Sequence, residues 1–402
     1  MKKTISLIAG AILCGGILLT GCGGGSSTNS NTQENAIEEP SGNGNYTSSS
    51  GNGNYTYTTL MEDYSKIKEI GSFKISNYNK VSEMIFNPTD TRAFISDRLN
   101  LYIYDINNLN NPKLLNTYDF YVGGRNIVLS KDNKLFIDDT LKYLKILDVN
   151  NPKEIKELGA YENNNTIVDF VLSNDGKTIF LTDNSSLKII DVSDPTFPAT
   201  TQTMSNIKKL FISNDDKRLY CLITNPLDPH AKEGLIILDL TDRTNPTQKG
   251  VFLVEDLSLG VYDMEVSKDG KVAILKTNQG IVILNINRSN DNNPDNITEF
   301  FSYPNLYSFD DIKIASNNKT VFGVRTSDLK VDVLDISDLQ NPKIINSIDF
   351  GYTYNAPYKV FLSNDEEKMF VTTTISAEGS ESPADGKTRV YIFDVSSYTQ
   401  AK

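Results

Sequence analysis

A sevenfold repeat constrains the fold of this chain more than any other feature of the sequence. Each copy is a short apolar run that ends in Asp or Asn, as in LKIID at residues 187–191. The terminal residues are Asp105, Asp148, Asp191, Asp239, Asn285, Asp335 and Asp394, at spacings of 43, 43, 48, 46, 50 and 59 residues. Strand-forming repeats of this period are typical of β-propellers and solenoids. Seven such units bury their apolar faces only by packing together, so we expect one folded body.

A hairpin precedes the repeated run in each unit. Polar turns such as SNDGK at 173–177 and SKDGK at 267–271 lie between two apolar segments, which predicts a β-hairpin with a positive φ in the turn. The Asp or Asn that ends the third strand can accept hydrogen bonds from backbone N–H groups two or three residues later. The turns lack the dense alternating oxygen ligands of calcium loops, so we interpret both features as structural.

The two ends of the repeat array indicate how the array closes. The last copy ends at Asp394 and leaves too few residues for a fourth strand, whereas a spare strand, Ile67 to Phe73, precedes the first unit. That spare segment, IKEIGSF, matches IKELGAY at 155–161, the outer strand of another unit. A closed ring gains by pairing two exposed strand edges. We therefore predict an all-β, seven-bladed β-propeller of four-stranded antiparallel blades over residues 60–402, in which the N-terminal strand completes the last blade.

The N-terminus has the features of an export signal. Lys2 and Lys3 precede an apolar segment that is too short for a permanent transmembrane helix. The residues Leu-Thr-Gly-Cys at 19–22 resemble the bacterial lipobox, which implies removal of residues 1–21 and lipidation of Cys22. Residues 22–59 are rich in Gly, Ser and Asn and predict a disordered tether. We expect a bacterial envelope protein held to the membrane by its N-terminal lipid. The resemblance favours the outer membrane, with a periplasmic or external location left open.

Charge and cysteine content exclude several classes of function. Removal of the signal leaves 37 basic and 51 acidic residues, a net charge of −14. Such a surface repels phosphate backbones, so nucleic acid is not an expected partner. Cys14 lies in the signal and Cys22 would be lipidated, which leaves Cys221 as the only free thiol and the only cysteine of the folded body. Cys221 lies in an apolar strand and is interpreted as a small buried hydrophobic residue.

The repeat also resembles a known family. The runs LKIIDVSDPTFP, LKILDVNNP and VDVLDISDLQNP resemble the LVIVD repeat of bacterial and archaeal surface proteins, within the wider group of YVTN- and TolB-like propellers. The sequence departs from that pattern at Asn285, in place of Asp, and after Asp394, where no proline follows. The resemblance implies an envelope or cell-surface location and a role in recognition.

Two sets of residues are candidates for ligand binding. Longer loops gather on one rim of the predicted ring, and three of their tyrosines suit recognition by stacking: Tyr307, Tyr352 and Tyr354. Seven positions near the starts of the inner strands predict a polar ring at one channel mouth: Glu83, Asn126, Asp169, Lys209, Asp263, Asp311 and Lys359. The four acids Glu83, Asp169, Asp263 and Asp311 could hold a divalent cation or a cationic ligand, which resembles the sites of propeller lactonases, or could be a solvated, salt-bridged channel lining. His230 is the only histidine, so no multi-histidine metal site is available and no cofactor is expected.

Three functional hypotheses follow from these patterns. The leading one is a non-enzymatic, lipid-anchored module that binds a protein or a small molecule on its loop-rich rim. The second is a metal-dependent, lactonase-like hydrolase that uses the carboxylates at the channel mouth. The third is a scaffold subunit of an envelope complex.

Overall fold

The computed structural model describes most of the chain after residue 66. The described residues are 67–75, 80–120, 123–139, 142–183, 185–193, 199–202, 204–224, 232–256, 258–287, 296–302, 308–351, 355–375 and 388–400. They belong to one compact unit, Glu62–Lys402. The predicted signal, Cys22 and the tether lie outside the described residues.

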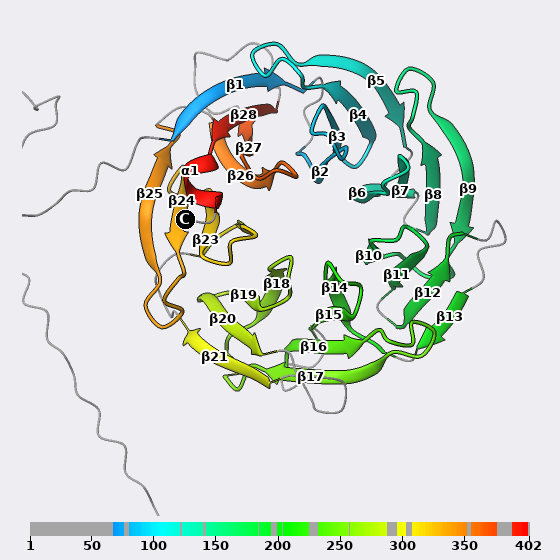
Figure 1. The fold of residues 1–402 in the computed structure, drawn as a ribbon, viewed down its shortest axis with the longest axis vertical. Helices are drawn as coiled ribbons and strands as arrows, with labels where there is room; N and C mark the ends of the chain where they lie inside the picture. The colour runs from blue at the N-terminus through cyan, green and yellow to red at the C-terminus, as the bar shows by residue number, and fades with distance from the viewer. Residues whose placement is uncertain are drawn as a thin grey trace, which may run out of the picture. The chain divides into compact units, whose positions relative to one another are not determined.

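The described residues form seven four-stranded antiparallel sheets that are arranged as blades around a central axis (Figure 1). The predicted seven-bladed β-propeller is therefore confirmed. In blades 1 to 6 the four strands follow one another in sequence from the axis to the rim. Sequential hairpins of this kind are the simplest antiparallel arrangement that a repeated strand–turn–strand pattern can form.

The strand bounds of the first four blades follow the repeat. Blade 1 contains β2 (Glu83–Phe86), β3 (Arg92–Ser96), β4 (Asn100–Asp105) and β5 (Lys113–Asp119). Blade 2 contains β6 (Gly123–Leu129), β7 (Lys134–Asp139), β8 (Tyr143–Asp148) and β9 (Lys156–Glu162). Blade 3 contains β10 (Asp169–Leu172), β11 (Thr178–Thr182), β12 (Leu187–Asp191) and β13 (Ala199–Gln202). Blade 4 contains β14 (Ile207–Ile212), β15 (Arg218–Ile223), β16 (Gly234–Asp239) and β17 (Thr247–Leu253).

The remaining blades continue the pattern up to the closure. Blade 5 contains β18 (Val261–Val266), β19 (Val272–Thr277), β20 (Gly280–Asn287) and β21 (Asn296–Ser302). Blade 6 contains β22 (Asp311–Ile314), β23 (Thr320–Arg325), β24 (Lys330–Asp335) and β25 (Lys343–Asp349). Blade 7 contains β26 (Asn355–Leu362), β27 (Lys368–Ile375), β28 (Arg389–Asp394) and β1 (Lys68–Lys74). A short helix, α1 (Ser396–Thr399), follows β28, and no helix in the described part of the chain is long and apolar enough to cross a membrane.

The N-terminal strand closes the ring, as predicted. β1 pairs antiparallel with β28, from Lys68 opposite Asp394 to Lys74 opposite Arg389 (Figure 1). The register of this pair shifts at Ile70, and the register of β8 with β9 shifts at the equivalent Leu158. Because β1 has the same bulge as an outer strand, it takes the place of the outer strand that blade 7 lacks in sequence.

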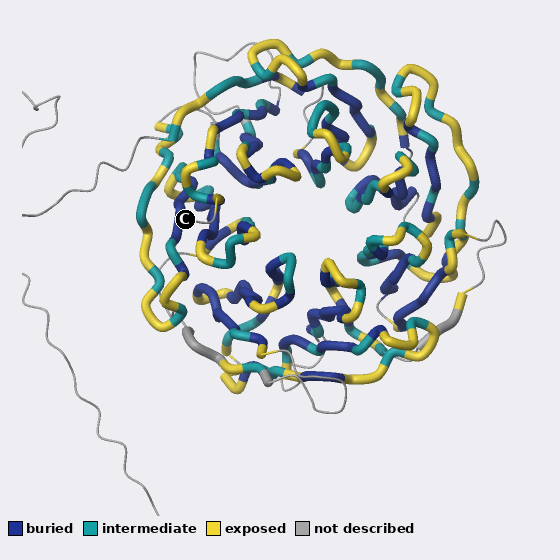
Figure 2. The backbone as a smooth tube through the Cα atoms, viewed as in Figure 1, coloured by how far each residue is buried: buried dark blue, intermediate teal, exposed yellow. Residues whose placement is uncertain are grey.

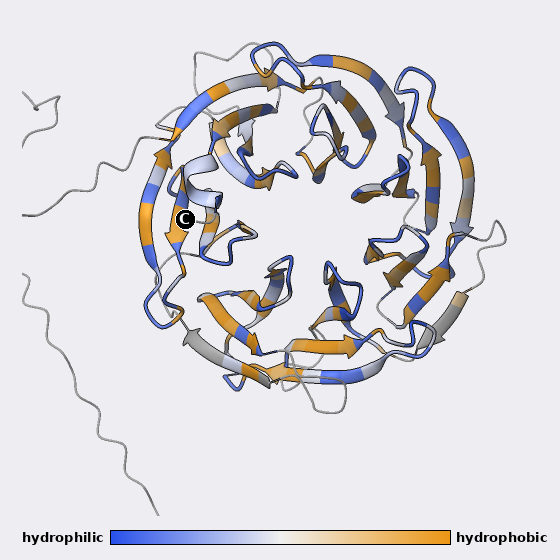
Figure 3. Cartoon of the chain, viewed as in Figure 1, coloured by the Kyte–Doolittle hydropathy of each residue, from blue (hydrophilic) through white to orange (hydrophobic). Residues whose placement is uncertain are grey.

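The core consists of layers between adjacent blades. Seven clusters of buried apolar residues fill the seven contacts between neighbouring blades, and one of them joins blades 7 and 1 through residues such as Phe73, Tyr104 and Phe370. The second and third strands of each blade are the most buried and most apolar (Figures 2 and 3). Full burial of one large aliphatic or aromatic side chain stabilises the fold by about 1.5–3 kcal/mol. The repeated run therefore specifies the packing of every blade.

The predicted turns and strand ends have the expected local structure. One residue in each of the seven hairpin turns has a positive φ, between 50° and 73°: Asp90, Asn133, Gly176, Asp216, Gly270, Asn318 and Glu366. Five turns contain a serine hydroxyl bonded to the Asp two residues later, as in Ser173 Oγ to Asp175 Oδ1 at 2.6 Å. All six repeat Asp residues accept the N–H two residues on, as Asp191 does from Ser193 at 2.9 Å. Both motifs therefore have a structural role.

Candidate functional site

The two faces of the ring carry different connections. The turn face carries the hairpin turns between the first and second strands of each blade. The loop face carries the connections between the second and third strands and those from one blade to the next. This division follows from the antiparallel order of the strands. The predicted polar ring lies near the loop face, because its members stand at or near the starts of the inner strands.

The predicted ring residues join neighbouring blades. Asp169 Oδ2 accepts the N–H of Leu210 at 2.7 Å, and Asp311 Oδ2 accepts the N–H of Val360 at 2.9 Å. Asn126 Nδ2 donates to the carbonyl of Val168 at 3.2 Å, and Lys359 Nζ donates to that of Ser82 at 2.5 Å, across the ring closure. Each of these bonds connects one blade to the next. The ring positions therefore help to hold the inner strands in register around the axis.

Asp263 belongs to a charged cluster. Its carboxylate oxygens lie 2.6 Å from Lys209 Nζ and 2.9 Å from Lys276 Nζ. Burial alone would raise the pKa of Asp263, but the two ammonium groups outweigh it and hold that pKa below its ordinary value. Glu83 Oε1 accepts its neighbouring N–H, that of Met84, at 3.3 Å. Among the described residues, no group of three or more His, Cys, Asp and Glu side chains could hold a metal ion. The four predicted acids thus do not converge on one cation.

Asp169 has the opposite protonation behaviour. Burial raises the pKa of its carboxyl group to about 7, although the N–H groups of Leu210 and Phe170 and the charge of Lys209 work against the shift. Glu83 adds to the shift by like-charge repulsion. Two carboxylates of the same predicted ring therefore differ in charge state near neutrality, because only Asp263 has two lysines beside it.

A pocket of about 660 Å³ opens at the loop face. Its walls come from blades 1, 2, 6 and 7 and from the connection between β1 and β2, which are far apart in sequence. The residues that line it are Lys80, Val81, Ser82, Asp97, Arg98, Arg125, Asp310, Thr326, Tyr358 and Lys359. We call it the loop-face pocket. Its volume suits a small organic ligand.

Both acids of the loop-face pocket already accept hydrogen bonds. Asp97 is 1% exposed and accepts the N–H groups of Leu99 and Asn100 at 3.0 and 2.8 Å and the hydroxyl of Tyr102 at 2.9 Å. Asp310 Oδ2 accepts the N–H of Thr326 at 2.7 Å. These carboxylates organise the loops that bear them, and neither forms an ion pair with a cation of the pocket.

The backbone around Arg98 is fixed by its neighbours. The carbonyl of Arg98 accepts the N–H of Gly123 at 3.0 Å, and that of Leu99 accepts the N–H of Phe120 at 2.6 Å. A side chain at Gly123 would overlap the carbonyl of Asp138, so the absence of a Cβ allows β6 to approach this closely. The β3–β4 loop is therefore anchored to blade 2, and Arg98 projects from a rigid base.

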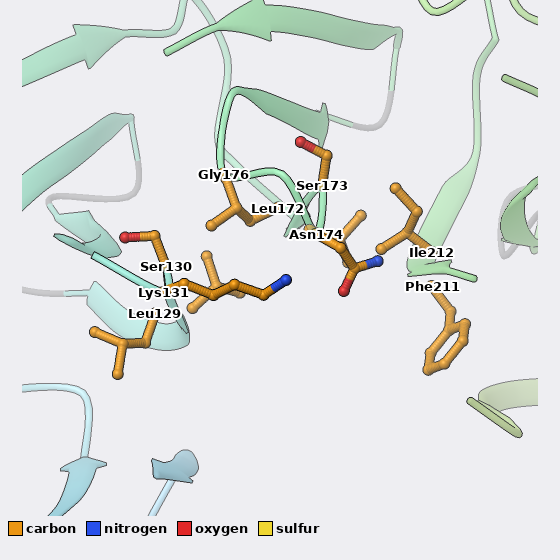
Figure 4. A pocket seen from close by; sticks show the side chains of 11 residues that line it. Leu129, Ser130, Lys131, Leu172, Ser173, Asn174, Gly176, Phe211 and Ile212 are labelled. Carbon is orange, nitrogen blue, oxygen red and sulfur yellow. The ribbon is translucent and has the colours of Figure 1, made fainter. Parts of the chain in front are cut away.

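A smaller pocket, of about 280 Å³, lies toward the turn face between the inner strands of blades 2, 3 and 4. Val128, Val171 and Phe211 contribute apolar walls. Lys131 extends from the β6–β7 turn of blade 2 toward Asn174 (Figure 4). Asn174 is already held by Asp216 Oδ1 at 2.8 Å. This pocket has a single cation and mostly apolar walls, which sets it apart from the loop-face pocket.

Several predicted residues cannot be located. Tyr307, Tyr352, Tyr354, His230 and the lipidation residue Cys22 lie outside the described residues, so their roles stay predictions. Glu83, Asp169, Asp263 and Asp311 are described and lie in the inner strands, as predicted. Cys221 is fully buried, and burial raises the pKa of its thiol.

Sequence reasoning missed three of the four cations of the loop-face pocket; the fourth, Lys359, belongs to the predicted ring. Arg125 directly precedes the ring residue Asn126, and Lys80 lies three residues before Glu83. Basic residues at these places in an otherwise acidic chain were the available signal. No sequence pattern pointed to Arg98, because the β3–β4 loop differs in sequence from the loops that join the second and third strands of the other blades.

Comparisons with known proteins agree with the fold. The model of the LVIVD repeat family matches residues 175–204, within blade 3. No curated protein sequence matches the chain significantly. The solved structures that resemble it include the β-propeller domain of Cps50 (Swd1) from Myceliophteria thermophila, with a TM-score of 0.60 and 8% identity over 82% of this chain and 99% of that one.

Two further structures have similar values. Hydrazine synthase from Kuenenia stuttgartiensis aligns with a TM-score of 0.57 and 13% identity over 78% of this chain and 95% of that one. A putative 6-phosphogluconolactonase from Bacteroides uniformis aligns with a TM-score of 0.55 and 14% identity over 67% of this chain and 85% of that one. At these identities the likeness concerns the β-propeller fold alone.

Proposed function

We propose that this protein is a lipid-anchored, non-enzymatic recognition module of the bacterial envelope, which binds its ligand in the loop-face pocket. The pocket carries the proposal, because six separate segments of the chain form its walls and the loop at Arg98 is fixed by backbone hydrogen bonds. Loops on a rigid scaffold are the usual place for binding residues. The anchor rests on the lipobox-like residues 19–22, and the tether holds the propeller away from the membrane.

Photo-crosslinking tests where the ligand or partner binds. In the test variant, a photoreactive residue replaces Leu99, which is 42% exposed on the loop face. In the control variant, it replaces Leu158, which is 52% exposed on the outer strand β9. Irradiation of intact cells should give a defined product from position 99 and none from position 158. A constant partner captured only at position 158 would favour the scaffold hypothesis instead.

Lipidation has an independent test. Cys22→Ala should remove the acyl groups, which mass spectrometry of the mature N-terminus detects, and should release the protein from the membrane fraction. Release of the variant, together with a native N-terminus that carries no acyl mass, would contradict lipidation at Cys22. Retention of Cys22→Ala in the membrane would show that another part of the chain holds it there.

The lactonase-like hydrolase is the second candidate, because a propeller described as a putative 6-phosphogluconolactonase shares the fold. It requires a cation among carboxylates, whereas Asp263 is paired with two lysines and Asp169 and Asp311 bond to the backbone of the next blade. Native metal analysis separates the two proposals. A stoichiometric ion that is lost from the Asp263→Ala plus Asp311→Ala variant would favour the hydrolase.

A further inference from the structure

We propose that the loop-face pocket binds a small organic anion, through a carboxylate or phosphate group. This inference rests on the proposed recognition function and names the chemical class of its ligand. It starts from a local inversion of charge. Four cationic side chains and two carboxylates line the pocket, a net formal charge of +2, whereas the chain as a whole carries −12.

The four cations come from different parts of the ring. Lys80 lies in the connection that follows β1, Arg98 in the β3–β4 loop, Arg125 in β6 and Lys359 in β26. Like charges that the fold brings together repel one another and raise the free energy of the folded state unless a counter-charge is present. A bound anion would supply that counter-charge, and low ionic strength would strengthen the interaction.

The cations retain hydrogen-bonding capacity. Lys80 and Arg98 form no ion pair with any described residue, and Lys80 Nζ lies 5.4 Å from the centre of the Tyr358 ring. Lys359 Nζ uses one N–H on the carbonyl of Ser82 at 2.5 Å. An ammonium group has three N–H donors, so Lys359 can still contact a ligand.

Arg125 is the least available of the four. Its Nε lies 3.8 Å from Asp138 Oδ2, which is too long for a hydrogen bond, and one terminal nitrogen reaches the carbonyl of Ile167 at 3.4 Å. Arg125 therefore contributes positive potential more than a direct contact.

The two arginine side chains favour an oxyanion over a halide or a neutral sugar. A guanidinium group is planar and offers paired N–H donors that match two oxygens of a carboxylate or a phosphate. Neither Asp97 nor Asp310 forms an ion pair with these arginines: Asp97 accepts two loop N–H groups and the Tyr102 hydroxyl, and Asp310 Oδ2 accepts the N–H of Thr326. Arg98 is thus the side chain that we expect to contact the oxyanion.

Titration calorimetry of the full-length protein in detergent tests the inference. The probes are citrate as a carboxylate, glucose 6-phosphate as a phosphate, glucose as the neutral counterpart of the latter, and choline as a cation. We expect citrate or glucose 6-phosphate to bind and glucose and choline not to bind. Which of the two anions binds more tightly identifies the preferred oxyanion. The affinity should fall as salt is raised.

Charge-removing variants locate the site. The double variant Lys80→Gln plus Arg98→Gln should raise the dissociation constant about tenfold or more, since it removes two charged donors. Lys153→Gln, at an exposed lysine in the β8–β9 connection of blade 2, is the matched control and should leave it unchanged. Thermal unfolding of each variant checks that the fold is intact.

The outcomes separate this inference from the proposed function. Failure of both anions to bind, or anion binding that the double variant does not weaken, overturns the anion inference. If glucose or choline binds and the double variant changes that binding, the pocket recognises a different class of ligand and the recognition module stands. If position 99 also gives no crosslinked product, the recognition module falls with it.

Discussion

The turn face and the loop face are built from the same repeats but differ in how uniform they are. On the turn face, all seven turns place a positive φ at the same position, and five contain the same serine–aspartate hydrogen bond. On the loop face, the residues directly before the predicted ring have almost nothing in common: Ser82, Arg125, Val168, Lys208, Tyr262, Asp310 and Tyr358. Uniform positions serve the fold that every blade shares, whereas varied positions are free to form one specific site.

This comparison predicts that the largest losses of stability come from the turn face. Gly270 has φ +73°, and a Cβ there would overlap the hydroxyl of Tyr220, which is fully buried and donates to the carbonyl of Gly270 at 2.9 Å. Gly270→Ala therefore combines backbone strain, overpacking and a lost hydrogen bond, and should destabilise the protein by about 3–5 kcal/mol. Chemical denaturation of the purified variant measures the loss.

Gly176→Ala is the matched control. Gly176 has the same φ of +73° in the equivalent turn of blade 3, but the nearest atom to an added Cβ is Ser130 Cβ, at 3.7 Å. This variant should lose only about 1–2 kcal/mol, from strain alone. In a Tyr220→Phe background, Gly270→Ala should cost less than in the native chain. Equal losses at Gly270 and Gly176 would show that packing between blades 4 and 5 does not tighten this turn.

The predicted ring, near the loop face, should give the next largest effect on stability, and this effect should depend on pH. The pKa of Asp169 is about 7 in the folded protein, against 3.8 for an ordinary aspartate. A raised folded-state pKa contributes stability that is fully present below the unfolded value and is lost as pH rises through about 7. The free energy of unfolding of the native protein, measured relative to that of Asp169→Asn, should therefore fall by about 2–3 kcal/mol from pH 5 to pH 8.

Asp263→Asn provides the control for this measurement. The lysines beside Asp263 lower its folded-state pKa, so its stabilising contribution is already complete at pH 5 and declines only in more acidic solution. The stability difference between the native chain and Asp263→Asn should thus stay constant from pH 5 to pH 8. A constant difference for Asp169→Asn as well would mean that Asp169 is ionised throughout this range.

The uniform face was also the part of the molecule that the sequence predicted best. The repeated turns and the six Asp caps follow from short motifs that recur in the repeats, and local hydrogen bonds suffice to form them. The closure by the segment Ile67 to Phe73 followed instead from its match to the outer strand at 155–161 and from the fourth strand that the last repeat lacks. The outer strand β13 of blade 3 was harder to find, because ATTQ has no apolar alternation.

The loop-face pocket could not be predicted in the same way. Its lining depends on which loops the ring brings together, and Lys80 meets Arg98 only after β1 has joined blade 7 and positioned the chain that follows. The predicted ring residues lie in or beside the inner strands, but their partners depend on the neighbouring blade: Asp263 contacts two lysines, and Asp169 accepts backbone N–H groups. Sequence patterns define a repeat, whereas contacts between repeats require the assembled structure.

The smallest expected effect separates two arginines, one on each face. On the turn face, Arg243 pairs with Asp175 at 2.7 Å and with Asp216 at 3.0 Å. Arg243→Gln should cost about 0.5–1 kcal/mol, and less at high salt, as for partly exposed ion pairs. On the loop face, Arg98 has no carboxylate partner among the described residues, so Arg98→Gln should change stability by less than about 0.5 kcal/mol.

Urea denaturation of both variants at low and high salt measures this contrast. Loss of Arg98 also removes repulsion from neighbouring cations, so its small effect should be stabilising at low salt and should vanish as salt screens the charges. The two arginines then respond to salt in opposite directions. If Arg98→Gln instead destabilises the protein as much as Arg243→Gln does, its guanidinium group has a structural partner. In that case the loop face would be built for stability as the turn face is.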